Sequence, residues 1–169
     1  MKTGLILVGG GLANSLIAHR ILRERPDFPL LIIGGRDGTF DEELTDERVR
    51  QAIDLAVDRQ DIVDTVFLGA ATVGSPGWVH PDKSVYNPEV AATHDPDAAQ
   101  QLLEDAGYTD SDGDGIREFD GQPMSFEMIT NSSDSLRLRI SELVSEMLGD
   151  VCIDVSIASV ETATWEEAV

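Results

Sequence analysis

The sequence LLEDAGYTDSDGDGIREFDG, residues 102–121, is the stretch around which the rest of the chain is organised. It begins as the last turns of a helix, which Gly107 ends, because glycine is strongly favoured just past a helix C-terminus. Asp110, Asp112 and Asp114 then stand at alternate positions, and Gly115 follows them. A helix followed by such a loop and then by a strand-like run indicates that helices and strands alternate along the chain.

The alternating aspartates of this loop predict a Ca²⁺ site. Carboxylates that lie close together repel each other, and a hard cation removes the repulsion by taking their oxygens as ligands. Ca²⁺ binds about six to eight oxygens, and a D-x-D-x-D-G loop supplies several from one short turn. The predicted ligands are Asp110, Asp112 and Asp114, with the carbonyl of Ile116 and the carboxylates of Glu118 and Asp120 completing the shell.

The match to a calcium-binding EF-hand is incomplete. An EF-hand loop ends in glutamate at its twelfth position, where this chain has Gly121. Pro123 and a strand-like run stand where the exit helix should begin. The alternative is therefore an acidic turn, rich in Asp and Gly, that binds no cation.

The composition excludes several kinds of partner. The 169 residues carry a net charge of −20, which argues against binding to nucleic acid or insertion into an anionic membrane. No apolar run reaches the length of a membrane span. One cysteine, Cys152, excludes an internal disulfide. So many carboxylates favour a halophilic source, where salt screens their repulsion, although an ordinary acidic surface would explain them too.

The first 35 residues differ in charge from the rest. Residues 1–35 hold four Lys/Arg and two Asp/Glu, a net of +2, whereas residues 36–169 hold eight and 30, a net of −22. This switch suggests two segments of different origin. We therefore divide the chain into an N-terminal unit of residues 1–35, a linker of residues 36–43 and a larger unit of residues 44–169.

The N-terminal unit has the pattern of a Rossmann-like βαβ unit. Residues 5–8 and 30–33 are apolar runs typical of buried strands, and residues 12–25 have the apolar spacing of a helix face. Glycines at the first strand–helix turn allow a pyrophosphate to sit on the helix N-terminus. The candidate residues for FAD or NAD(P) are Gly9, Gly11, Leu12 and Ala13.

Two features weigh against a dinucleotide. The third glycine position carries Asn14, and glycines stand where an acidic residue should end the second strand. The stretch LILVGGGLANSLIAHRILRERPDFPLLII nevertheless resembles the N-terminus of bacterial flavoprotein lycopene cyclases, which implies FAD or NAD(P) binding in that family. The alternatives are a βαβ unit that serves only as a scaffold and a secretory signal, which the glycine run and the early His19-Arg20 argue against.

Helix caps and periodicity divide residues 44–169 into alternating helices and strands. Thr45, Asp58 and Asp95 are expected to cap three helices, and Ser133 or Asp134 a fourth. Residues 124–130 and 152–160 alternate as strands, and a strand–helix–strand unit implies parallel pairing. The expected fold is α/β (α+β), a small mixed sheet with flanking helices. The expected inward residues of the fourth helix are Leu136, Ile140, Leu143, Val144 and Met147.

Five segments of this larger unit resemble the family 5 extracellular solute-binding proteins, the peptide, dipeptide and nickel receptors of ABC importers. They are RVRQAIDLAVDRQDIVD, GSPGWVHPD, YNPE, DPDAAQQLLEDAGYTDSDGDGIREFDGQPMSFEMITNS and RISELVSEMLGDVCIDVSIASVE. The resemblance covers about three quarters of the chain. It implies one lobe of a periplasmic-binding-protein fold, whereas the family's ligand lies between two lobes.

This resemblance implies a binding role without catalysis. The expected ligand is a peptide or another small solute, the partner is the membrane permease of an ABC importer, and the location is extracellular or periplasmic. No clear signal peptide accompanies it, and no catalytic set emerges from the scattered histidines. The candidate ligand-binding residues are Trp78 and Tyr86 in the long loop 69–88, and Asn131 and Ser132 at a strand end. Trp78 is equally explained as an anchor of the core.

Cys152 stands where the family usually has glycine. If that position needs a left-handed backbone, cysteine costs about 1 kcal/mol there. The leading hypothesis is a chimeric or truncated chain whose bulk is a solute-binding lobe. Its rivals are a minimal flavin or nicotinamide enzyme related to lycopene cyclase, and a designed scaffold whose only ligand is the cation.

Overall fold

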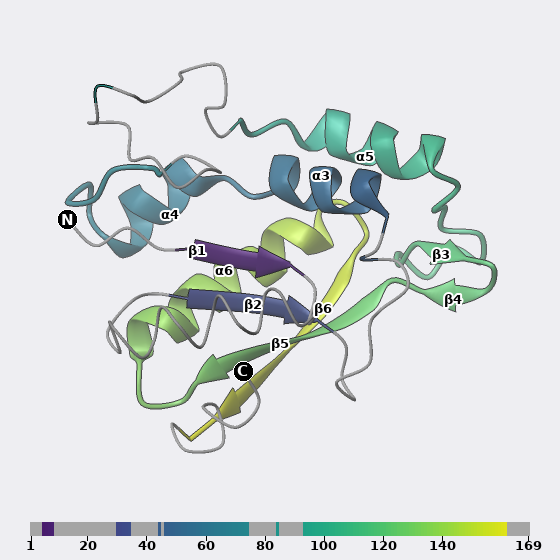
Figure 1. Cartoon of the computed structure of the whole chain (residues 1–169). Coiled ribbons are helices and arrows are strands. Elements are labelled where there is room, and N and C mark those ends of the chain that lie inside the picture. Colours follow the sequence, from purple (N-terminus) through teal and green to yellow (C-terminus); the bar gives the residue numbers. More distant parts are fainter. Residues whose placement is uncertain are drawn as a thin grey trace.

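A computed structural model describes residues 5–8, 30–34, 44, 46–74, 84 and 93–161. Its main sheet has four strands in the order β1-β2-β5-β6 (Figure 1). β1 (Leu5–Val8) runs parallel to β2 (Leu30–Gly34), β2 runs antiparallel to β5 (Ser125–Asn131), and β5 runs parallel to β6 (Asp154–Val160). The sheet is therefore mixed, as expected, and strands from the first 35 residues belong to it.

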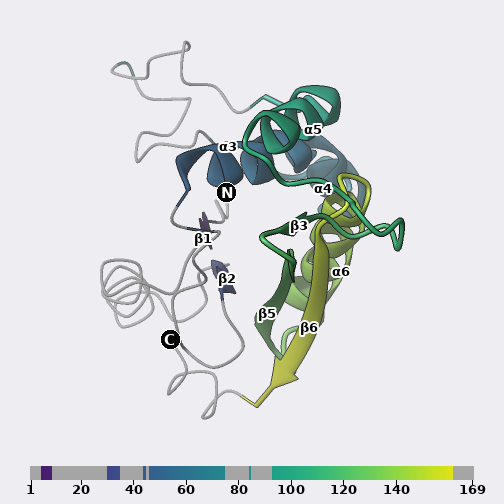
Figure 2. The same ribbon diagram turned by 90° about the vertical axis from the view of Figure 1, so that its right-hand side faces the viewer.

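Besides the main sheet, the described residues form four helices and a small hairpin. The helices are α3 (Glu47–Ala56), α4 (Arg59–Val66), α5 (Pro96–Asp105) and α6 (Ser135–Gly149). The hairpin pairs β3 (Glu118–Phe119) with β4 (Gln122–Pro123). α6 covers one face of β5 and β6, and α3 lies beside α5 at one end of the sheet (Figure 2). None of the described helices combines the length and the apolarity that crossing a membrane requires.

Aspartate side chains cap all four helices. Asp58, Asp95 and Asp134 each accept hydrogen bonds from backbone N–H groups of the first turn, as expected. The first cap differs from the expectation, because Asp46 rather than Thr45 caps α3 and accepts from the N–H of Arg48 at 2.8 Å. Aspartate adds a full negative charge at the positive end of the helix dipole, which a threonine hydroxyl lacks.

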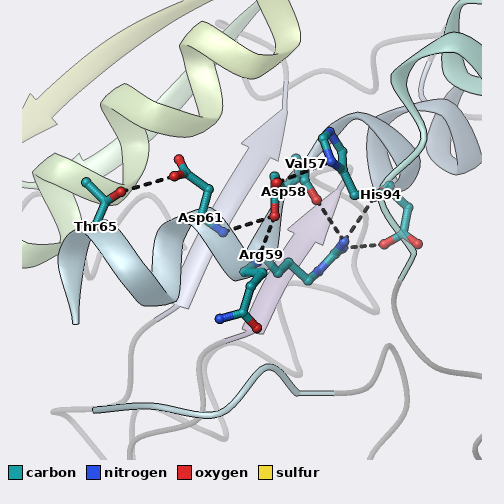
Figure 3. A network of polar contacts seen from close by, with 8 residues as sticks. Val57, Asp58, Arg59, Asp61, Thr65 and His94 are labelled. Atoms are coloured by element: carbon teal, nitrogen blue, oxygen red, sulfur yellow. Dashed lines mark hydrogen bonds and ion pairs between the residues drawn. The ribbon is translucent and has the colours of Figure 1, made fainter. Parts of the chain in front are cut away.

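The corner between α3 and α4 is held by polar contacts (Figure 3). The guanidinium of Arg59 donates to the backbone carbonyls of Asp54 and Val57 at 3.0 and 3.4 Å and pairs with the Asp54 carboxylate. One oxygen of Asp58 caps α4, and the other lies 3.2 Å from Nδ1 of His94. This contact brings the chain that enters α5 back to the start of α4.

The core lies between α6, the β5–β6 pair and the α3–α5 pair. Phe126, Met128 and Thr130 alternate along β5 on the buried side, and Val155 is the register partner of Phe126. The buried stripe of α6 differs from the expected one. Leu143 and Val144 are buried as predicted, and Ile140 and Met147 are partly buried against the core.

Leu136, predicted to face inward, is 36% exposed instead. Besides Leu143, the buried positions of α6 are Arg137, Ser141, Val144 and Leu148, spaced four, three and four residues apart. The stripe is therefore rotated by one residue at the start of the helix. Arg137 and Ser141 are polar residues at inward positions there. A prediction based on the spacing of apolar residues alone leaves them out of the buried stripe.

Candidate ligand and cation sites

The aspartate loop, residues 110–117, is closed at its base by backbone hydrogen bonds. The N–H of Thr109 donates to the carbonyl of Glu118 at 3.1 Å, and the N–H of Glu118 donates back at 3.0 Å. Gly113 and Gly115 have φ angles of +83° and +91°. Side chains other than glycine avoid this left-handed region, so these two glycines allow the chain to curl back on itself.

Four acidic side chains converge inside this loop. Asp110, Asp112, Asp114 and Glu118 each place a carboxylate oxygen within 4.8 Å of the others. Three of the four are exposed, so the loop opens to solvent. The convergence of oxygen ligands fits a hard cation such as Ca²⁺.

The same carboxylates also accept hydrogen bonds from their own loop. Asp110 accepts from the N–H groups of Gly113 and Gly115 at 2.7 and 3.0 Å. Glu118 accepts from both the N–H and the hydroxyl of Ser111, at 2.8 and 2.7 Å. These bonds offset part of the repulsion between the carboxylates, so the loop geometry is compatible with both a cation site and an acidic turn.

The other two predicted ligands, Ile116 and Asp120, are placed differently from the four converging carboxylates. The N–H of Ile116 donates to the Asp114 carboxylate at 2.8 Å, and Ile116 has only its carbonyl to offer a cation. Asp120 lies in the turn of the β3–β4 hairpin with a φ of +51°. It is not among the four converging residues.

Arg117 is a residue of this region that sequence reasoning missed. Its side chain is almost fully buried beneath the loop. Nε donates to the carbonyl of Val151 at 3.1 Å, Nη1 donates to the carbonyl of Tyr108 at 2.8 Å, and Nη2 lies 3.5 Å from the Glu104 carboxylate. One guanidinium thus joins the end of α5, the loop and the turn after α6.

The second candidate site lies at the end of β5. Asn131 is buried, and its side-chain oxygen accepts from the N–H and the hydroxyl of Ser133 at 2.9 and 2.7 Å. That oxygen shapes the turn into α6, so Asn131 has a structural role here. Ser132 is exposed, and its N–H donates to the carbonyl of Val160 on β6 at 2.8 Å.

The start of α6 gathers further polar groups near this strand end. Arg137 is buried, and its Nε lies 3.1 Å from the carboxylate of Asp134, the cap of the helix. The hydroxyl of Thr130 is buried and has no hydrogen-bond partner among the described residues. Of the predicted ligand-binding residues, the structure therefore places Asn131 and Ser132 next to a polar strand end.

The remaining predicted site residues lie outside the described residues. They are Trp78 and Tyr86 of the long loop and Gly9, Gly11, Leu12 and Ala13 of the N-terminal turn.

A family model matches most of the chain. Residues 35–169 match the model described as "Bacterial extracellular solute-binding proteins, family 5 Middle". The chain is 36% identical over 131 residues to the oligopeptide-binding protein AppA of Bacillus subtilis, which covers 75% of this chain and 24% of that protein. It is 27% identical over 124 residues to the nickel-binding periplasmic protein of Escherichia coli, covering 69% and 22%. The chain thus spans about a quarter of the length of these relatives.

Solved structures show the same similarity. The structure of NikA from Brucella suis in complex with Fe(III)-EDTA has a TM-score of 0.63 and 30% identity, covering 72% of this chain and 24% of that one. The structure of AppA from Bacillus subtilis in complex with a nonapeptide has a TM-score of 0.65 and 25% identity, covering 90% and 36%. These similarities support the expected fold class.

Proposed function

The chain belongs to the family 5 bacterial extracellular solute-binding proteins, and we propose that it forms part of a lobe that binds a peptide or a similar small solute. The main support is the match over residues 35–169 together with the β5–α6–β6 unit, which presents a polar strand end. Membership in a family of binding proteins agrees with the prediction that the chain is not an enzyme.

The proposed ligand contact is the end of β5 and the first turn of α6. Ser132 is exposed there, and the buried Arg137 and Asn131 hold the turn in place. Trp78 and Tyr86 are proposed to add aromatic contacts from the long loop. Because the chain spans about a quarter of its relatives' length, it supplies only part of a cleft, and the affinity of the chain alone is expected to be weak.

Isothermal titration with di- to pentapeptides tests this proposal. The expected result is binding in the millimolar range that Ser132→Tyr abolishes by filling the strand end. Leu68→Tyr, an exposed position at the end of α4, is the matched control and should leave binding unchanged. Sub-micromolar binding by this chain alone, or binding unaffected by Ser132→Tyr, would contradict it. A parallel titration with Ni²⁺ distinguishes the two ligand classes that the relatives' names suggest.

The partner and the location follow from the same proposal. In an ABC importer the binding protein delivers its solute to a membrane permease, so the proposed partner is such a permease and the proposed location is extracellular or periplasmic. We propose that residues 1–35 form an N-terminal unit, residues 36–43 a linker and residues 44–169 the larger unit.

We also propose that the aspartate loop binds Ca²⁺ through Asp110, Asp112, Asp114 and Glu118. The convergence of their oxygens within 4.8 Å supports this, and the exposed loop leaves room for water to complete the coordination shell. The cation would have a structural role, because the base of the loop is tied to the core through Arg117.

The rival function is dinucleotide binding at the glycine-rich turn of residues 9–13. The parallel pairing of β1 with β2 supports it, because a Rossmann unit requires parallel strands at this point. A purified sample with flavin absorbance at about 450 nm would favour dinucleotide binding. A colourless sample that takes up neither FAD nor NAD(P) would leave the solute-binding lobe as the function.

A further inference from the structure

The strand β5 has a different partner on each of its two edges. On one side it pairs with β6 along its whole length, from Ser125↔Asp154 to Asn131↔Val160. On the other side it pairs with β2 over a shorter stretch, from Ile32↔Ile129 to Gly34↔Glu127. The family match begins at residue 35, directly after β2. The strand that covers this second edge therefore lies just before the residues that the family model matches.

An uncovered edge of β5 would be a hazard. A strand edge exposes unpaired N–H and C=O groups that pair readily with another extended segment. The sequence of β5, SFEMITN, is mostly apolar or β-branched and has a single charge, a composition typical of segments that form intermolecular sheets. Among the described residues, β2 is the only strand beside this edge.

We propose that β1 and β2 act as an edge cover for the lobe. β2 pairs with β5 within the same chain and so prevents that edge from pairing with β5 of a second copy. β1, the outer strand on the β2 side of the sheet, is only four residues long, and short outer strands are one way in which natural proteins limit edge-to-edge association. This gives the two strands β1 and β2 a role that requires no bound dinucleotide.

A designed disulfide tests the pairing directly. Ile32 and Ile129 lie opposite each other in the antiparallel ladder, where Cα atoms are about 4.5–5.5 Å apart and a disulfide can form. In a Cys152→Gly background, Ile32→Cys with Ile129→Cys should oxidise to an intramolecular disulfide in the monomer. The matched control is Ile32→Cys with Ala158→Cys, because Ala158 lies one strand further away, at about 10 Å. Failure of the first pair to link, or equal linking of both, would overturn the proposal.

Single prolines test the consequence for association. Adjacent strand residues direct their N–H groups to opposite edges, so one of Ile32→Pro and Ile33→Pro removes a bond to β5 and the other a bond to β1. The variant that removes a bond to β5 should speed hydrogen exchange at Glu127–Ile129 by roughly tenfold or more, with the α6 amides still protected. It should also self-associate in light scattering at high salt, where the net charge of −20 is screened. Unchanged exchange and a monomeric state in both variants would overturn the proposal.

Discussion

The backbone N–H of Arg117 donates to the carbonyl oxygen of Cys152 at 2.9 Å. This bond ties the base of the aspartate loop to the turn between α6 and β6. Cys152 has a φ of +63°, so the left-handed backbone that was considered from the sequence as a condition is present at this position. The loop and the turn are therefore two parts of one structural unit, although about 35 residues separate them along the chain.

Replacement of Cys152 by glycine is expected to stabilise the fold. A side chain with a Cβ is strained at this φ, and glycine removes the strain, so Cys152→Gly should raise the free energy of unfolding by about 1 kcal/mol. Urea denaturation followed by circular dichroism measures the change. Cys152→Ala keeps the Cβ and should give little gain, so an equal gain in both variants would contradict the explanation by strain.

Replacement of Arg117 by methionine is expected to destabilise the fold strongly. The carbonyls of Tyr108 and Val151 lose their guanidinium donors in a buried place, which should lower the free energy of unfolding by about 2–4 kcal/mol. Arg139→Met is the control. Arg139 is exposed and, among the described residues, pairs with Glu142, three residues further along α6, so its loss should cost less than about 0.5 kcal/mol. Similar losses in the two variants would refute the role given to Arg117.

The lowered pKa of Asp46, the cap of α3, makes the stability of the fold depend on pH. A hydrogen bond from the Arg48 guanidinium holds the pKa of the Asp46 carboxyl below its usual range. Because the folded pKa lies below the unfolded one, charged Asp46 stabilises the fold above the unfolded pKa, and this contribution is lost as pH falls through the folded pKa. An NMR titration of the carboxyl should show a depressed midpoint that Arg48→Met moves upward. Arg139→Met should leave it in place, and a midpoint at or above that of ordinary aspartate would be inconsistent with this account.

Calcium is expected to raise the thermal stability of the chain. A cation that binds only the folded loop stabilises it by about 2.7 kcal/mol at a hundredfold excess over its dissociation constant. The melting temperature should be higher in Ca²⁺ than in EDTA, and Asp112→Asn with Asp114→Asn should remove the difference. Asp120→Asn, outside the converging cluster, should retain it. Identical melts with Ca²⁺ and EDTA would leave the loop as an acidic turn.

Salt is expected to stabilise the chain. A net charge of −20 repels itself in the compact state, and the Debye length falls from about 10 Å at 0.1 M to about 3 Å at 1 M salt. The melting temperature should therefore rise between these concentrations in both NaCl and KCl. A rise only with sulfate salts would point to a general effect on hydrophobic burial instead.

The local features of the fold were predictable from the sequence. Asp58, Asp95 and Asp134 cap helices because a short polar side chain before an apolar periodic run satisfies free N–H groups within the same segment. The strands β5 and β6 were also anticipated, and the possibility of a left-handed backbone at Cys152 was raised by the glycine that the family usually has there. Each of these features depends on residues that are close together in the chain.

The features that sequence reasoning missed depend on distant parts of the chain. In the sequence, Arg117 has no feature that separates it from other charged residues. It is buried only because α5 and the turn after α6 pack around it in the fold. The outward position of Leu136 follows from Arg137 and Ser141 taking inward positions, which an apolar pattern does not reveal. Asp120 falls outside the cation cluster because the Asp120–Gly121 turn directs the chain into β4.

The antiparallel joint between β2 and β5 has a consequence for biosynthesis. β2 emerges from the ribosome roughly ninety residues before β5, so it has no partner on that side while the helices between them are translated. The β5–α6–β6 unit, by contrast, is contiguous and can form as soon as it is complete. The nascent chain therefore carries an apolar strand with one unpaired edge until β5 has been made, and a chaperone that binds extended apolar segments is expected to act in this interval.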